Sequence, residues 1–368
     1  MIVFYDESIL SYVASIRDYF GLSSNYLKND KLSKLISIRK PSKVFLLLID
    51  GMGANLIEKK LSKDSFLRRN MFCKTTTVFP PTTTAATTSI RTGKAPNENA
   101  WLGWMQDIKE VNDIVVPFFG KGFYNDKNYG QDLMYKIAPV TFIEDELNNK
   151  KIKARSLFPS FMEDGCDDFQ TMCNRLISYS NNDDYSFIYA YWDKYDTYMH
   201  ENGPSSKVCD DYLLFINNEI ERLANSLSND TMLIITADHG QIDVKSEYNL
   251  YESKFDKYLK RLPSIEPRAM TFFIKDGMQK EFEKEFKDEF EESFILLSHQ
   301  QVLDTKLFGN KENNIRFEEF IGDYIAIAKS NIVLAYKDHP IPSMKGQHAG
   351  MCEDELMIPI IVYWNKIR

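Results

Sequence analysis

Three short, predominantly apolar runs constrain the fold of this chain more than any other feature of its sequence. They occupy residues 43–49, 185–192 and 231–236, and polar or glycine residues follow each of them closely. A run of this length without alternating polar positions is typical of a parallel strand, because both faces of such a strand are buried. We therefore expect the three runs to lie inside one sheet.

Helical segments are predicted between these runs. They are residues 7–40, 54–63 and 205–227. A further strand is expected to stop at Pro80, and the small residues from Thr83 onward favour a tightly packed helix. Residues 355–364 read as a last strand. This alternation predicts an α/β fold with a mostly parallel central sheet and helices on both faces.

Residues 254–338 differ in character from the rest of the chain. A charged stretch there carries an aromatic residue at every fourth position, which on a helix forms one apolar stripe: Phe282, Phe286, Phe290 and Phe294. Strand-like segments follow at 294–298 and 323–329. We predict a small inserted α+β lobe at 254–338, between core segments at 1–253 and 339–368.

Composition excludes several classes of protein. The chain of 368 residues has 45 lysines and arginines against 53 acidic residues, a formal charge of −8. This balance argues against binding to a nucleic acid polymer or an anionic membrane. The five cysteines include no CxxC pair, and neither a signal peptide nor a long apolar span is recognisable. We expect a cytoplasmic protein.

Residues suited to chemistry gather at the predicted strand ends. Asp50 follows the first run, Asp196 follows the second, and Asp238 and His239 follow the third, while Thr83 starts a helix after another strand. In open α/β sheets, ligands bind outside the carboxyl ends of the strands. These five side chains are therefore predicted to share one site.

Two more histidines extend this set. Asp196 and His200 are spaced D-x-x-x-H, so both can face one ion from a helical turn, and His348 lies in the loop sequence KGQHAG. Taken singly, such a pair is more often a surface ion pair, and an aspartate after a strand more often caps a helix. Together, carboxylates and imidazoles are the usual ligands of zinc and related divalent ions.

The motifs resemble those of the alkaline phosphatase superfamily, and within it the type I phosphodiesterase and nucleotide pyrophosphatase branch. They occur in the family's order between residues 46 and 364: LLLIDGMG, TTVFPPTTTAATTSIRTGKAP, WDKYDTYMHENGP, LIITADHG, GQHAG and IPIIVYW. The resemblance implies an alkaline phosphatase-like fold and a metal-dependent phosphoric ester hydrolase.

The resemblance also implies roles for individual residues. Thr83, ten positions before Gly93, matches the nucleophile, with Thr82 and Thr84 as alternatives if the register slips. Two divalent ions are implied, with zinc favoured and manganese or magnesium as alternatives. Their ligands would be two sets: Asp50, Thr83, Asp238 and His239 for one ion, and Asp196, His200 and His348 for the other.

One position departs from the family pattern. The branch places a phosphate-contacting asparagine about 21 residues after the nucleophile, where this chain has Trp104. We interpret Trp104 as a substrate contact or as a wall of the pocket.

The expected function is a two-metal phosphodiesterase or nucleotide pyrophosphatase that acts through a phospho-threonine intermediate on a small phosphate ester or nucleotide. The alternatives are a phosphomonoesterase, a phosphonate hydrolase or a phosphomutase on the same metal core. A non-catalytic, metal-stabilised binding protein is a further alternative.

Overall fold

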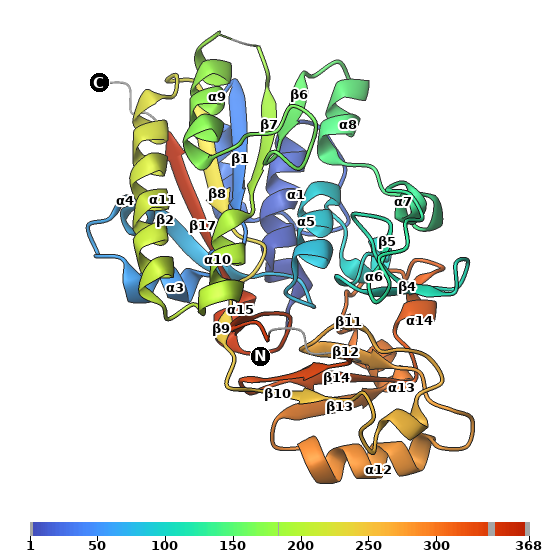
Figure 1. The fold of residues 1–368 in the computed structure, drawn as a ribbon. Coiled ribbons are helices and arrows are strands. Elements are labelled where there is room, and N and C mark those ends of the chain that lie inside the picture. Colours follow the sequence, from blue (N-terminus) through green and yellow to red (C-terminus); the bar gives the residue numbers. More distant parts are fainter. Residues whose placement is uncertain (1–2, 183, 338–342, 365–368) are drawn as a thin grey trace.

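A mixed six-stranded sheet forms the centre of the molecule (Figure 1). The computed structural model describes residues 3–182, 184–337 and 343–364. The strand order is β2-β17-β8-β1-β7-β6. The three apolar runs form its interior as β1 (Lys43–Ile49), β7 (Phe187–Trp192) and β8 (Thr231–Thr236). Their side chains are almost all buried, which confirms the prediction of fully covered strands.

Five of the six strands point the same way. β1 pairs parallel with β7 and β8, and β6 (Ala154–Leu157) pairs parallel with β7. The last strand, β17 (Met357–Trp364), runs antiparallel to both β8 and β2 (Met71–Thr76). The chain reaches β17 from α15 (Glu353–Leu356), at the edge where the parallel strands end, so β17 must run back through the sheet. The predicted mostly parallel sheet is confirmed.

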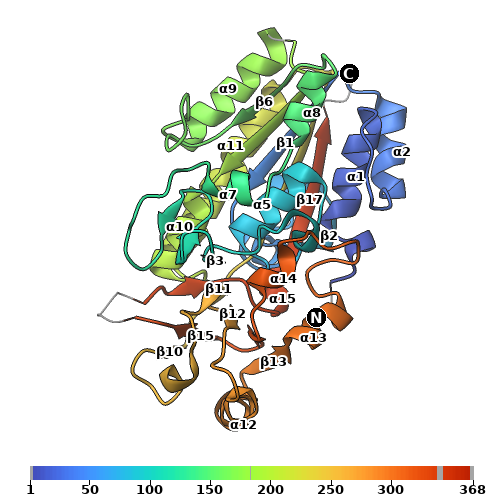
Figure 2. The same ribbon diagram turned by 90° about the vertical axis from the view of Figure 1, so that its right-hand side faces the viewer.

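Helices cover both faces of this sheet, as predicted. Figure 2 shows the sheet between two groups of helices. One group is α9 (Phe169–Asn182), α10 (Lys194–Asn202) and α11 (Lys207–Ser226). The other group is α1 (Ile9–Tyr19), α2 (Asp30–Arg39), α5 (Thr83–Thr92) and α8 (Ile143–Asn149). Among the described residues, no helix is long and apolar enough to cross a membrane.

The amino-terminal segment differs from its prediction. Residues 7–40 form two helices, α1 and α2, instead of one continuous helix. Gly21, just after α1, has a φ of +70°, which a continuing helix does not permit. The side chain of Asn29 then accepts a hydrogen bond from the N–H of Leu32 and caps the second helix.

A smaller sheet lies beyond the end of the central sheet in both views (Figures 1 and 2). Its four strands are ordered β11 (Ser264–Glu266), β12 (Ala269–Phe272), β14 (Tyr324–Ala328) and β13 (Phe294–Ser298). The helix α12 (Gln279–Phe290) packs on it through Phe282, Phe286 and Phe290. Phe294, which the sequence pattern adds to this stripe, begins β13 instead.

The two faces of the smaller sheet bury different partners. Ala269, Ile325 and Ile327 belong to the large core that contains β1, whereas Met270 and Phe272 pack with the aromatic side chains of α12. Successive residues of a strand point to opposite faces, so the sheet lies between the main core and α12. This sheet falls within the predicted 254–338 lobe. The proposed boundaries stay a prediction, and position 338 lies outside the described residues.

Candidate active site

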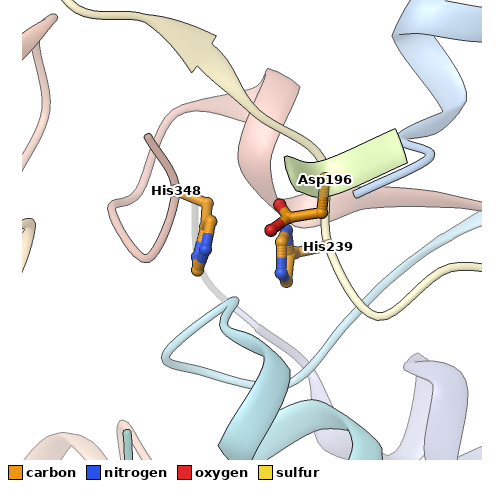
Figure 3. A group of neighbouring side chains, drawn as sticks. All are labelled: Asp196, His239 and His348. Carbon is orange, nitrogen blue, oxygen red and sulfur yellow. The ribbon is translucent and has the colours of Figure 1, made fainter. Parts of the chain in front are cut away.

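The ends of the central strands bring the predicted site residues together. Asp50 follows β1, Asp238 and His239 follow β8, and Asp196 lies in α10 after β7. Ligand atoms of Asp50, Asp238 and His239 all lie within 4.8 Å of one another. The same holds for Asp196, His239 and His348, whose side chains approach one another in Figure 3.

Glycine permits the close approach of β1 and α10. Gly51 has a φ of +71°, which favours glycine. A Cβ atom at this position would lie 2.6 Å from Cε of Met199 and 3.1 Å from Oδ1 of Asp196. The glycine after Asp50 therefore allows the two aspartates to belong to one site.

The three consecutive threonines at the start of α5 have different surroundings. Oγ1 of Thr83 lies 3.4 Å from Oδ2 of Asp50 and 3.3 Å from Nε2 of His239. The hydroxyl of Thr82 donates instead to Glu266. The hydroxyl of Thr84 is buried and has no hydrogen-bond partner within the described part of the chain. Of the three hydroxyls, that of Thr83 faces the cluster of aspartates and histidines.

Backbone carbonyls orient all three imidazole rings. The Nδ1 atoms of His200, His239 and His348 lie 2.8, 3.1 and 3.1 Å from the carbonyl oxygens of Gly346, Gly240 and Pro81. A carbonyl oxygen can only accept a hydrogen bond, so each Nδ1 carries a hydrogen and each Nε2 is left for another partner. This arrangement is common for metal-binding histidines.

Two carboxylate oxygens of the cluster are buried without hydrogen bonds from any described residue: Oδ1 of Asp50 and Oδ2 of Asp238. Oδ1 of Asp50 lies 3.2 Å from Nε2 of His239, and although burial opposes the charged form of this histidine, Asp50 raises its pKa. Burial and the charges of Asp238 and Asp196 raise the pKa of Asp50 well above its usual range. Burial raises the pKa of Asp238 to about 7.

Buried carboxylates of this kind are costly unless a cation neutralises them. The donor set of carboxylate oxygens and imidazole Nε2 atoms suits zinc and related divalent ions. The residues present therefore fit the metal centre that the sequence motifs imply.

Asp196 and His200 form an ionic pair in the absence of a metal. Nε2 of His200 lies 3.1 Å from Oδ2 of Asp196. Burial lowers the pKa of His200, but Asp196 raises it by more, to about 9. Burial opposes the ionised form of Asp196, but His200 outweighs it and lowers the pKa of this carboxyl. A divalent cation would take the place of the Nε2 proton.

His348 differs from the other two histidines. Its ring stacks on that of His239, with centroids 3.8 Å apart and planes 22° apart. Burial and the neighbouring His239 lower its pKa well below the usual value. A neutral imidazole is the form that binds a metal ion.

A cavity of about 660 Å³ opens next to Thr83. Its walls include Trp104, Phe123, Glu266 and Met344, together with the proposed ligands Asp196, His200 and His348. A second cavity of about 380 Å³ adjoins it and shares the walls formed by Met105, Phe123, Pro267, Met344 and Gln347. The cluster thus lies at one end of a predominantly apolar space.

Residues 106–351, more than half of the chain, match the family model of type I phosphodiesterase / nucleotide pyrophosphatase. The chain belongs to this family. It is thereby a hydrolase of the phosphodiesterase and pyrophosphatase type within the alkaline phosphatase superfamily. No curated protein sequence matches the chain.

Solved structures share the fold of this family member. Murine ectonucleotide pyrophosphatase / phosphodiesterase 5 superposes with a TM-score of 0.66 at 14% identity, covering 89% of both chains. The human protein of the same name gives 0.67 at 15% identity, covering 87% of both. Phosphonoacetate hydrolase from Sinorhizobium meliloti 1021 gives 0.65 at 13%, covering 88% of this chain and 90% of that one.

Three residues around the site of this phosphodiesterase-family protein lie outside the set that the sequence predicts. The hydroxyl of Tyr191 donates to Oδ2 of Asp50, and the amide of Gln241 donates to Oδ1 of Asp196. Gln241 directly follows the ADHG motif, so its place in the sequence could have marked it as a neighbour of the site. Tyr191 is hidden in an apolar strand, and Glu266 lies far from every motif.

Proposed function

We propose that this protein hydrolyses phosphodiesters at a centre of two divalent cations, with Thr83 as the nucleophile. The observation that carries the proposal is the position of the Thr83 hydroxyl, near both Asp50 and His239 and in the wall of a cavity.

Two ligand sets support two ions. Asp50, Asp238, His239 and the Thr83 hydroxyl would hold one, and Asp196, His200 and His348 the other. The unpartnered oxygens of Asp50 and Asp238 and the carbonyl-oriented imidazoles support this division. His239 is close to both groups, so its place in the first set is inferred from the family motif. Zinc fits the donors best, with manganese or magnesium as alternatives.

When bound, two such cations supply positive charge that stabilises the anionic oxygens of an in-line displacement and lowers the pKa of a bound hydroxyl. Oγ1 of Thr83 gives up its proton to solvent and attacks phosphorus, so that an O–P bond forms. The bond from phosphorus to the departing oxygen breaks, and that oxygen takes up a proton from water and leaves as the alcohol. The phospho-threonine is then hydrolysed by water, which frees Thr83 and releases the phosphomonoester. Thr83 is the first residue of α5, whose free N–H groups and helix dipole favour an anionic phosphoryl group.

A small monoanionic diester suits the cavity. Lys345 is the only lysine or arginine among its lining residues, and Lys345 is exposed. A dianionic monoester or a phosphonate that carries a carboxylate would lack a second cationic partner. Trp104 lines the same cavity, and we propose that its ring contacts the ester group. The titles of two structural relatives name small ligands, AMP for the murine protein and phosphonoacetate for the hydrolase.

A substrate panel tests this function. Zinc-loaded protein would be assayed on bis(p-nitrophenyl) phosphate, p-nitrophenyl phosphate and phosphonoacetate. We expect the diester to be the best substrate. Hydrolysis of the monoester or of phosphonoacetate alone would replace the proposal by the corresponding alternative.

We also propose a reducing, cytoplasmic environment. All five cysteines are free, and three of them are buried: Cys166, Cys173 and Cys209. Thiols in this state are typical of intracellular proteins.

A further inference from the structure

Glu266 is a buried carboxylate in the wall of the active-site cavity. It is the last residue of β11, and only 3% of its surface is exposed. It belongs to none of the family motifs, and the proposed chemistry gives it no role. A buried carboxylate beside a site for a phosphoryl anion is unexpected, because like charges repel.

The hydrogen bonds of Glu266 leave one oxygen available. The hydroxyl of Thr82 and the backbone N–H of Trp104 both donate to Oε1, the latter at 2.8 Å. Oε2 accepts no hydrogen bond from the described residues, while Glu266 lines the cavity that contains Thr83. The two bonds fix the carboxylate, and Oε2 remains as an acceptor for a ligand.

Glu266 and the proposed nucleophile Thr83 line the same cavity. Thr82 contacts Glu266, and the next residue, Thr83, contacts Asp50 and His239. The bond from Thr82 therefore holds Glu266 at the start of α5, beside the residue that faces the cluster. A donor joined to the phosphoryl group by a short linker would share this cavity with Oε2.

The other walls favour a cationic donor. The rings of Trp104 and Phe123 line the same cavity, and an aromatic face attracts an alkylammonium group. The exposed Lys345 is the only lysine or arginine among the lining residues that could compete for the carboxylate. A second phosphate group at this place would instead lie beside the carboxylate of Glu266, which offers it no hydrogen-bond donor.

On the basis of the proposed function, we propose that Glu266 is a specificity-determining residue that selects phosphodiesters of amino alcohols. Its Oε2 accepts a hydrogen bond from the ammonium group of an –O–CH₂–CH₂–NH₃⁺ ester. The carboxylate offsets the positive charge of the ammonium group of such a zwitterionic substrate, whereas a diphosphate is repelled.

Two esters of equal size test the selection. p-Nitrophenyl 2-aminoethyl phosphate and p-nitrophenyl propyl phosphate differ only in an ammonium in place of a methyl group. We expect metal-loaded protein to prefer the aminoethyl ester by at least about tenfold in kcat/KM, the scale of one charged hydrogen bond. Glu266→Gln keeps the size of the side chain and the oxygen that accepts from Thr82. It should reduce the ratio of the two kcat/KM values to about one, mainly by raising KM for the aminoethyl ester.

Asp126→Asn is the matched control. Asp126 is an exposed acid of the adjoining cavity with a φ of +56°, which asparagine tolerates, so the variant loses the same charge at a different place. The preference should survive in this variant. Equal kcat/KM for the two esters in the wild type, or an equal loss of preference in both variants, would overturn the role of Glu266.

A binding experiment separates this proposal from the proposed function. If no ester is hydrolysed, the proposed function fails, but metal-loaded Thr83→Ala can still be titrated with 2-aminoethyl phosphate and propyl phosphate. Tighter binding of the aminoethyl compound that disappears in Thr83→Ala/Glu266→Gln supports the role of Glu266. Equal binding of the two compounds refutes it.

Discussion

Thr82, Thr83 and Thr84 are identical in chemistry, and only their surroundings distinguish them. The first donates to Glu266, the second faces Asp50 and His239, and the third has a buried hydroxyl. A one-residue shift on a helix turns a side chain by about 100°, so these differences follow directly from the position at which α5 begins.

Replacing Thr83 by alanine should remove the nucleophile and leave most ligands in place. We expect turnover to fall by at least about 10³, with metal content near two per chain by elemental analysis. Thr84→Ala is the control and should change turnover little, because its hydroxyl does not face the cluster. Full activity in Thr83→Ala would exclude Thr83 as the nucleophile.

Tyr191 should act on the metal site through Asp50. Burial and Asp50 raise the pKa of Tyr191 well above its usual value, so the phenol keeps its proton and donates it to Oδ2 of Asp50. Tyr191→Phe should weaken binding of one metal ion by about 10–100-fold, measured by competition with a chelator.

Tyr189→Phe is the control on the same strand. The hydroxyl of Tyr189 is buried with no hydrogen-bond partner among the described residues, so its removal should leave metal affinity unchanged. Equal metal affinities of the two variants would contradict the role assigned to Tyr191.

At the scale of elements, the smaller sheet and the carboxyl-terminal part of the chain are joined by a buried ion pair. Arg268, between β11 and β12, makes two bonds to the carboxylate of Glu355, at 2.7 and 2.9 Å. The same carboxylate accepts the backbone N–H groups of Gly350 and Cys352, in the segment that follows His348. One residue pair therefore ties β11, which carries Glu266, to the loop that carries His348.

Arg268→Met should be strongly destabilising. Both side chains of the pair are fully buried, and the substitution leaves the carboxylate of Glu355 without its cation. We expect a loss of about 3–5 kcal/mol in the free energy of unfolding, measured by urea denaturation. Lys59→Ala breaks the exposed pair with Asp354 and should cost at most about 1 kcal/mol. Similar costs for the two variants would show that the buried pair does not join the elements.

For the whole molecule, we expect the acidic cluster to make stability depend on metal and on pH. Burial raises the pKa of Asp238 to about 7 and that of Asp50 well above its usual range. A carboxyl whose folded-state pKa is raised stabilises the fold at low pH, and this contribution is lost as pH rises through the folded-state pKa. Without metal, the fold should therefore lose stability as pH increases from about 5 to about 8.

Thermal denaturation of chelator-treated protein measures this effect. The melting temperature should be higher at about pH 6 than at about pH 8, by several degrees, and zinc should restore it at pH 8. Metal-free Asp238→Asn should show a weaker pH dependence, because the amide does not ionise. A metal-free wild type that is more stable at pH 8 than at pH 6 would contradict the assigned electrostatics.

The sequence by itself determined the elements of the central sheet and the chemical types of the site. An uninterrupted apolar run buries both faces only as an inner strand of a covered sheet, so β1, β7 and β8 were predictable. Parallel strands bring their carboxyl ends to one edge of the sheet, so a site at that edge was predictable too. The resemblance to the family likewise predicted that Asp50, Thr83 and His348 share one site, and their roles stay a prediction. The break between α1 and α2 was harder to predict, since it depends on a single left-handed glycine and one cap.

Only the tertiary structure decided which side chains complete the site. Glu266 reaches Thr82 across 184 positions, and Tyr191 reaches Asp50 across 141. Neither contact leaves a local pattern, because hydrogen bonds between distant segments depend on how sheets pack and not on periodicity. The antiparallel direction of β17 and the burial of the smaller sheet against the main core were likewise decided by the tertiary structure. Both depend on where distant segments of the chain meet.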